Sequence, residues 1–454
     1  PVKFSVDAPG RSGDLVVTVD AYDAAGNQVG TGSTMTTVAA PTANLMLDAT
    51  DFVVNTTVAM DQYLGVDYDY DSHGLQLAAG GDGTWTVAFR DNCNNTNSCS
   101  LYARRFDAKG VAVKTAAAAG TDSFPLNTAL SDQFTETAIA TAGSTTVAVW
   151  NSTDVTMARG VACRTIDAQG TTSSGELSLS NDASSVVSLA PLMTGNFAVA
   201  WQIGFAPNAS IRTAIVKPDC TLLTAVASAS TTPGASTGPT SAHVASNADK
   251  LLYAWITDGD VYVRTGANNT GPSGTGDMKI LSHDANYTAE TVRLAPLGTG
   301  FALVVRWVNP TNTGSPGKIE LFQLNASGSP MGMQTLITDQ SRSDFISGWQ
   351  APGIAVRAMD GAMLIVWHQC DEAGTVGTCD VYGRMVRPNG TPSGAPFMIP
   401  TTTTLDQTSP SAIALPDGSF AVAWNDQSHT GADSSGYAVR ARIIYPAYDP
   451  NGSM

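Results

Sequence analysis

The chain has 454 residues, of which 39 are acidic and 23 basic, and its formal net charge is −16. Only 14 % of the residues are charged, against about a quarter in ordinary soluble domains, while 43 % are hydrophobic. This composition excludes a disordered chain, which has few large apolar residues, and a nucleic-acid-binding protein, which needs a basic face. Together with 43 glycines, it favours a large, mostly β protein.

The first predicted strands lie in residues 1–57. Residues 14–30 alternate apolar and polar side chains and then turn at Ala-Gly-Asn, and residues 45–48 and 52–55 supply further extended segments. About four strands are visible, fewer than the roughly seven of an immunoglobulin sandwich. We therefore expect a small, partial immunoglobulin-like β domain that docks or anchors the rest of the chain, with the missing strands either upstream of Pro1 or supplied by another chain.

An acidic run lies in residues 58–71, which are predicted to form a linker. Asp67, Asp69 and Asp71 alternate with tyrosines, and alternate carboxylates of an extended chain project to one side. Hard oxygen donors suit Ca²⁺, although Gly74 and Ala78 depart from the spacing of known calcium loops. The run is thus a candidate calcium site, with an ordinary solvated linker as the alternative, and no other cofactor is expected.

From residue 72 onward the sequence repeats itself. Residues 418–424 read Gly-Ser-Phe-Ala-Val-Ala-Trp, and seven such apolar runs end in an aromatic residue, 51 to 61 residues apart. A second motif follows each run, clearest at 101–110, 161–170 and 381–390, and ends in an Asp/Asn-x-x-Gly turn. Four short antiparallel strands in each unit predict a seven-bladed β-propeller over 72–446, followed by a tail at 447–454. We expect the ring to close between residues 58–77 and the final blade.

The terminal aromatic residues of these runs have a predicted structural role. Because a middle strand of a blade is covered by neighbouring blades on both faces, its sequence reads as a continuous apolar run. Large aromatic side chains at its end then fill the wider gap between blades. The residues concerned are Phe89, Trp150, Trp201, Trp255, Trp307, Trp367 and Trp424.

Six cysteines indicate disulfide bonds. Cys93 and Cys99 are close in sequence, as are Cys370 and Cys379, and the polar residues between the members of each pair suit a stapled loop. Cys163 and Cys220 remain for a longer-range bridge. An even count in such contexts favours an oxidising compartment. No apolar run is long enough to span a bilayer, so we expect a protein that is extracellular, on the cell surface or in the periplasm.

The repeats resemble bacterial secreted or lipoprotein-type β-propeller repeats of the form Asp-Gly-x-Phe-Val-Val-Ala-Trp, then Tyr-x-x-Arg-x-Phe-Asp-x-x-Gly, as in surface proteins of myxobacteria. The resemblance covers roughly residues 72–446 and implies the propeller fold and export. It implies no single activity.

Motifs that carry catalysis are missing from the sequence. No H-E-x-x-H, G-x-S-x-G, C-x-x-C-H or P-loop occurs. Arg104, Arg164 and Arg384 share one place in the second motif, which predicts a peripheral structural role and not an axial carboxylate site. His368 and the pair Asn425-Asp426 follow their tryptophans at equivalent places that reach one propeller face.

These observations favour a non-catalytic, exported binding or structural module that contacts other proteins of a surface or extracellular assembly. Two alternatives stay open. A lectin would use exposed aromatic and Asn/Asp residues to bind glycan. A polysaccharide-active hydrolase or lyase would need two carboxylates a few ångströms apart on the axial face. The primary expectation is that the chain is not an enzyme.

Overall fold

The computed structural model describes residues 14–22, 28–37, 48–49, 51–58, 60–64, 76–93, 99–113, 122–128, 133–153, 159–168, 170–173, 175–181, 184–204, 208–231, 240–248, 250–273, 276–309, 317–339, 351–370 and 379–445. These residues form strands β1 to β33 and no helix, so none of them belongs to a helix that could cross a membrane. The predicted all-β fold is confirmed.

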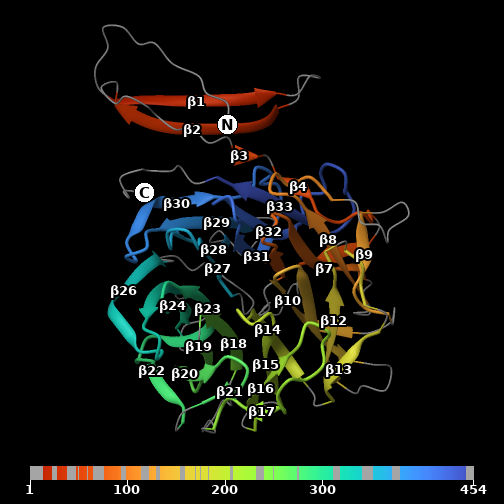
Figure 1. Cartoon of the computed structure of the whole chain (residues 1–454). Coiled ribbons are helices and arrows are strands. Elements are labelled where there is room, and N and C mark those ends of the chain that lie inside the picture. The colour runs from red at the N-terminus through yellow and green to blue at the C-terminus, as the bar shows by residue number, and fades with distance from the viewer. Residues whose placement is uncertain are drawn as a thin grey trace.

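Seven antiparallel sheets of four or five strands stand around a common axis (Figure 1). The strands nearest the axis contact one another in a closed ring that runs through β6, β10, β14, β18, β23, β27 and β31 and back to β6. The predicted seven-bladed propeller is therefore confirmed.

The first four blades follow one another along the chain. Blade 1 consists of β5 (Asp61–Tyr63), β6 (Leu77–Ala79), β7 (Trp85–Cys93), β8 (Ser100–Phe106) and β9 (Ser123–Pro125). Blade 2 consists of β10 (Gln133–Ala142), β11 (Thr145–Thr153), β12 (Arg159–Ile166) and β13 (Leu177–Ser180). Blade 3 consists of β14 (Ser184–Pro191), β15 (Phe197–Ile203), β16 (Ser210–Val216) and β17 (Ala227–Ser228). Blade 4 consists of β18 (Thr240–Asn247), β19 (Lys250–Thr257), β20 (Asp260–Ala267), β21 (Gly271–Pro272) and β22 (Met278–Leu281).

The last three blades include one strand from the other end of the chain. Blade 5 consists of β23 (Thr288–Leu297), β24 (Gly300–Val308), β25 (Lys318–Leu324) and β26 (Pro330–Asp339). Blade 6 consists of β27 (Gly353–Val356), β28 (Met363–Cys370), β29 (Cys379–Val386) and β30 (Pro392–Met398). Blade 7 consists of β31 (Gln407–Ala414), β32 (Phe420–Asp426), β33 (Ala438–Ile444) and β4 (Phe52–Val53).

Strand β4 closes the ring. It pairs with β33, so that Val53 lies opposite Arg440, while the chain continues directly into β5 of blade 1. The ring is thus closed by hydrogen bonds between the two ends of the propeller sequence. Strand β4 falls inside the segment 1–57 that was expected to be a separate domain, and β5 falls inside the expected linker.

A three-stranded sheet precedes the propeller. Its strands β1 (Asp14–Tyr22), β2 (Gln28–Thr37) and β3 (Asp48–Ala49) are ordered β1-β2-β3, and β1 pairs antiparallel with β2. Its immunoglobulin-like character and the division of the chain into domains stay predictions.

The seven terminal aromatic residues lie in the interfaces between blades. All are at most 5 % exposed. Each packs into a cluster formed with the preceding blade: Trp201 of blade 3, for example, packs with Val149 and Cys163 of blade 2. Phe89 of blade 1 packs with Ala423 and Val439 of blade 7, which continues the same pattern across the point of closure. Burial of a large aromatic side chain stabilises a fold by about 2–3 kcal/mol, so these contacts hold the ring together.

An arginine of the third strand also reaches the preceding blade, in five of the seven blades. Its guanidinium donates to a backbone carbonyl at, or just beyond, the outermost strand of that blade. The pairs are Arg104 with Val54 (2.8 Å), Arg164 with Leu126 (2.9 Å), Arg264 with Ala229 (3.3 Å), Arg384 with Ile337 (2.5 Å) and Arg442 with Ile399 (2.6 Å). We call these contacts the arginine clamps. Burial lowers the pKa of the Arg104 and Arg164 guanidinium groups.

All six cysteines form the predicted disulfides. Cys93–Cys99 and Cys370–Cys379 each join the end of a second strand to the start of the third. Cys163–Cys220 links β12 of blade 2 to the turn after β16 of blade 3. The third bridge is therefore a covalent link between blades. Three disulfides fit an oxidising compartment.

Removing one arginine clamp should destabilise the propeller. In Arg164→Met, the carbonyl of Leu126 loses a charged donor in a buried interface, and we expect the free energy of unfolding to fall by about 2 kcal/mol. Denaturant unfolding measures the change. The matched control is Arg212→Met, because Arg212 donates to the Ser228 hydroxyl of its own blade at 3.3 Å. Equal effects of the two substitutions on the free energy of unfolding would contradict the stabilising role of the clamp.

Candidate functional site

The site lies on one face of the ring. Because the strands of each blade are antiparallel, the innermost strands begin on the same face on which the tryptophan-bearing second strands end. We call this the entry face. It therefore gathers the polar residues that follow each tryptophan, together with the residues that precede each innermost strand.

Two carboxylates meet on the entry face between blades 6 and 7. Asp380 is the second residue of β29, and Asp406 directly precedes β31. The amide N–H of Cys379 donates to Asp406 Oδ1 at 3.1 Å, which holds the Asp406 carboxylate next to the backbone of Asp380. Asp406 is 1 % exposed, whereas Asp380 is only partly buried.

The surroundings of Asp380 favour its protonated form. Burial, and then the negative charge of Asp406, raise the pKa of the Asp380 carboxyl to about 6. At mildly acidic pH this partly buried side chain is therefore a proton donor. A carboxyl whose pKa is raised by burial and by a second carboxylate is the arrangement found in acid–base catalysis.

His368 lies on the neighbouring strand β28, opposite Val381, and its imidazole is neutral near neutral pH. The residue is only 4 % exposed, and its Nδ1 accepts the amide N–H of Ser409 at 3.4 Å. Burial, together with the charge of Arg306, lowers the pKa of the His368 imidazole to about 3. The prediction that His368 reaches a propeller face is therefore wrong, because the Ser409 backbone of the next blade covers it.

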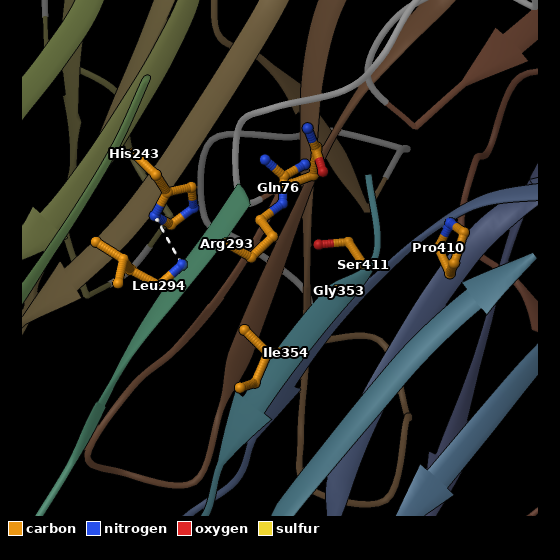
Figure 2. Close-up of a pocket in the computed structure, with 8 residues that line it drawn as sticks. All are labelled: Gln76, His243, Arg293, Leu294, Gly353, Ile354, Pro410 and Ser411. Carbon is orange, nitrogen blue, oxygen red and sulfur yellow. Dashed lines mark hydrogen bonds between the residues drawn. The ribbon is translucent and has the colours of Figure 1, made fainter. Parts of the chain in front are cut away.

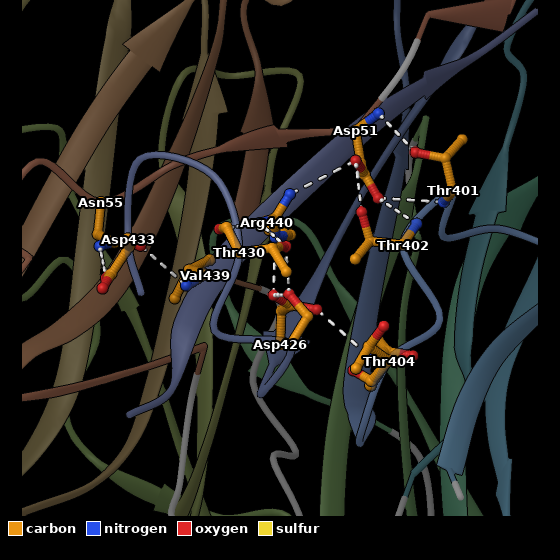
Figure 3. Close-up of polar contacts among 12 residues, drawn as sticks. Asp51, Asn55, Thr401, Thr402, Thr404, Asp426, Thr430, Asp433, Val439 and Arg440 are labelled. Atoms are coloured by element: carbon orange, nitrogen blue, oxygen red, sulfur yellow. Dashed lines mark hydrogen bonds and ion pairs between the residues drawn. The ribbon is translucent and has the colours of Figure 1, made fainter. Parts of the chain in front are cut away.

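Asp426, by contrast, is neutralised in a buried network (Figure 3). Arg440 Nε donates to Asp426 Oδ2 at 2.7 Å, and Arg440 also pairs with Asp51 at 3.5 Å. The backbone N–H groups of Thr401 and Thr402 donate to Asp51 at 3.0 and 3.1 Å. This network connects Asp51, the residue before β4, to blade 7 and to the Thr401–Thr402 segment that precedes blade 7. The charges of the network therefore stabilise the closed ring.

A second buried contact continues the closure (Figure 3). Asn55 Nδ2 donates to Asp433 Oδ2 at 2.7 Å, and Asn55 Oδ1 accepts the amide N–H of Val439 at 2.9 Å. Asn425 Oδ1 accepts the amide N–H of Leu64 at 2.5 Å. The predicted polar positions Asn425 and Asp426 are thus structural.

The candidate calcium ligands cannot be placed. Asp67, Asp69 and Asp71 lie outside the described residues, so calcium binding there stays a prediction. Within the described ranges, no group of three or more His, Cys, Asp or Glu side chains is placed to hold a metal ion.

The recurring arginines lie where the sequence placed them, at the periphery. Arg104 also pairs with Asp122 at 3.3 Å, as expected of a structural arginine beside an acidic loop. The partner that the clamps share is a backbone carbonyl, which the sequence analysis did not anticipate. The site formed by Asp380 and Asp406 was not predicted, because the two residues are 26 positions apart. Asp380 does occupy a repeated position, since Asp-Val-Tyr at 380–382 matches Asp-Val-Tyr at 260–262.

No protein-family profile matches the sequence, and no curated protein matches it either. Solved structures do match over most of the chain. An α-L-arabinofuranosidase from Fusarium graminearum is 9 % identical, with 87 % of this chain and 98 % of that chain covered and a TM-score of 0.45. A Penicillium chrysogenum α-L-arabinanase in complex with arabinobiose is 7 % identical, with 87 % and 98 % covered and a TM-score of 0.47. A fungal alcohol oxidase with copper is 12 % identical, with 86 % and 78 % covered and a TM-score of 0.48.

These comparisons contradict two expectations, namely that the chain is a non-catalytic module and that it is not an enzyme. The matching structures named above are those of enzymes, and two of them act on arabinose-containing glycosides by name. The repeat accounts for the blades alone, and a regular scaffold does not exclude a catalytic site on its face. At these identities and TM-scores, however, the likeness carries no substrate or reaction over to this chain.

The buried His368 should make the fold sensitive to acid. Since the pKa is lowered in the folded state, the unfolded chain binds a proton below about pH 6.5 that the folded chain does not bind until about pH 3. The free energy of unfolding should thus fall with decreasing pH in this window, by up to about 1.4 kcal/mol per pH unit from this group.

His368→Asn removes this contribution while Asn Oδ1 can still accept the N–H of Ser409. Urea unfolding of wild type and variant at pH 7, 5.5 and 4.5 measures it. We expect the stability advantage of the wild type over the variant to shrink with decreasing pH. An advantage that stays constant over this range would show that His368 is not held neutral.

Proposed function

We propose that the protein is an exported polysaccharide-active hydrolase in which Asp380 donates a proton to the glycosidic oxygen. The observation that carries the proposal is the contact between the Asp380 and Asp406 segments on the entry face, with one partly exposed carboxyl and one buried carboxylate. Glycoside hydrolysis needs a carboxylic acid that is still protonated at working pH.

The two carboxylates have different parts in this proposal. Asp380 is partly exposed and has a pKa of about 6, so that it can protonate the leaving-group oxygen as the bond to the anomeric carbon breaks. A water molecule then bonds to the anomeric carbon and gives its proton back to the Asp380 carboxylate. Asp406 is too deeply buried to touch substrate. It is a positioning residue, because its charge keeps the proton on Asp380 and its hydrogen bond to Cys379 holds the start of β29 in place.

The disulfide bonds support a location outside the cytoplasm. Cys370–Cys379 joins the two strands that flank the site, directly beside Asp380, and would persist in an oxidising compartment. We infer that the protein works outside the cytoplasm, in the extracellular space, at the cell surface or in the periplasm, on polysaccharide that it meets there. The resemblance of its repeats to bacterial secreted and lipoprotein-type propellers supports the same location.

Asp380→Asn should abolish hydrolysis. Reducing-end release from a panel of neutral and acidic polysaccharides measures the activity, and we expect kcat/KM of the variant to fall at least 100-fold, as is typical for the loss of a general acid. The matched control is Asp107→Asn on the opposite face, where Asn can still accept the N–H groups of Lys109 and Val111 as Asp107 Oδ1 does. Full activity of the Asp380 variant, or no cleavage of any polysaccharide by wild type, would overturn the proposal.

The pH profile tests the role of Asp406. Wild-type kcat/KM should decline as the pH rises through about 6, because Asp380 then loses its proton. Asp406→Asn removes the neighbouring negative charge and keeps an oxygen acceptor for the Cys379 N–H. This variant should therefore move the decline to lower pH. A profile that does not move would assign Asp406 a merely structural role.

A further inference from the structure

A small cavity is lined by residues of, or next to, the innermost strands of five blades (Figure 2). Gln76, His243, Arg293 and Ser411 are among its lining residues, and Asp380 is not. The volume of the cavity is about 40 Å³, which is room for about three water molecules. A sugar ring does not fit, so a polysaccharide must meet Asp380 outside this cavity. There the position of the Asp380 side chain depends on the end of strand β29.

Two disulfides occupy the same place in two different blades. Cys93–Cys99 of blade 1 and Cys370–Cys379 of blade 6 each link the end of the second strand to the start of the third strand, on the entry face. The next residue in the chain is Ser100 in blade 1 and Asp380 in blade 6. The same covalent link therefore stands beside the proposed proton donor in one blade and beside a hydroxyl side chain in the other.

Strand pairing places Asp380 one step from the open end of its ladder. Within the β28–β29 ladder, Cys370 lies opposite Cys379 at the end, and Gln369 lies opposite Asp380 at the next position. Terminal positions of a ladder open most readily, because no further pairs hold them from outside. A covalent bond between the two terminal residues prevents this opening, and so it holds the backbone of Asp380 in register.

The rest of β29 is held by other contacts. Val381, the residue after Asp380, is fully buried in the interface with blade 7, and its carbonyl accepts the amide N–H of Ile399 at 2.9 Å. Pairing of β29 with β30 begins at the next residue, and pairing with β28 continues along the strand. Loss of the bridge should therefore release Cys379 and Asp380 and leave the blade folded.

The same bridge also holds the second carboxylate. The amide N–H of Cys379 donates to Asp406 Oδ1 at 3.1 Å, and the Asp406 carbonyl accepts the amide N–H of Gln427 at 2.9 Å. Asp406 is thereby fixed to blade 7 on one side and to the bridged residue on the other. Displacement of Cys379 would separate the Asp380 and Asp406 segments and expose the Asp380 carboxyl to water. Both changes remove causes of the raised pKa of Asp380.

We propose that the Cys370–Cys379 disulfide is the positioning element of the Asp380 site, so that the site is complete only after this bridge has formed. Formation joins the two sulfurs by exchange with an oxidant of the disulfide class, which takes up the two electrons and two protons of the thiols and becomes a dithiol. Such bridges form in oxidising compartments. The inference rests on the proposed function, and it adds that the enzyme gains its proton donor on export.

Carboxyl titration tests the placement of Asp380 without any substrate. In protein labelled at the carboxyl carbons of aspartate, the Asp380 signal is the one missing from Asp380→Asn, and NMR follows its titration. In wild type we expect a midpoint of about 6. In Cys370→Ser/Cys379→Ser, where serine stands for the reduced thiol, we expect the midpoint to fall by about one pH unit or more toward the ordinary value of about 3.9. An unchanged midpoint would overturn the proposal.

The matched control is Cys93→Ser/Cys99→Ser, which removes the equivalent bridge of blade 1. This variant should keep the Asp380 midpoint, although both variants should unfold at lower temperature than wild type. An equal shift of the midpoint in both variants would assign the bridges a general structural role and contradict the proposal. If the serine variant of blade 6 does not fold, Cys370→Ala/Cys379→Val, which keeps apolar side chains, replaces it.

Activity measurements separate this inference from the proposed function. On a polysaccharide that wild type cleaves, kcat/KM of the blade 6 variant should fall at least tenfold, and its decline with rising pH should move to lower pH. The blade 1 variant should keep both. Full activity of the blade 6 variant would refute the positioning role. No cleavage by wild type would refute the proposed function instead, and the titration alone would then decide the placement of Asp380.

Discussion

The structure depends on the need to cover both faces of every blade. The second strands carry continuous apolar runs, so a blade with one bare face would expose a large aromatic residue and its neighbours to water. Each blade covers the next through the same two contacts, the buried aromatic side chain and, in five blades, the arginine clamp. Such a series is stable only when it returns on itself, which explains why Phe89 packs against blade 7 and why a strand from the start of the chain completes that blade.

Closure also accounts for a group of buried charges. Asp51, Asp426 and Arg440 meet where β4 joins the last blade, and Asn55 and Asp433 continue the contact toward blade 1. These groups are paired within the interface, and so they hold the two ends of the ring in register. Asp380 differs from them because it stays partly exposed and has a pKa raised to about 6. Among the acidic side chains described here, those of the closure network therefore stabilise the fold, whereas Asp380 can donate a proton.

Predictions from the sequence succeeded wherever a residue belongs to the repeat. The strand order of the blades, the number of blades and two of the cysteine pairs followed from periodic positions or close spacing, and Cys163–Cys220 was the pair that remained. They failed for function, because the expectation of a non-catalytic module relied on the regularity of the repeat. Asp380 stands at a repeated strand position that most blades fill with other residue types, so no motif marks this residue as functional. His368 was predicted to reach a propeller face, because the backbone of the following blade that buries it cannot be located from the sequence.

By itself, the sequence determined the all-β class, the seven blades, the aromatic residues between them and the oxidising chemistry of the cysteines. Each of these follows from local rules: strand periodicity, turn chemistry and the apolar character of a strand that is covered on both faces. Only the tertiary structure decided that β4 closes the ring, that two aspartates 26 residues apart share one site, and that polar side chains from separate blades line one small cavity. Those features arise where distant segments converge, and the distance between such segments in space is set by the closed ring and not by their separation along the chain.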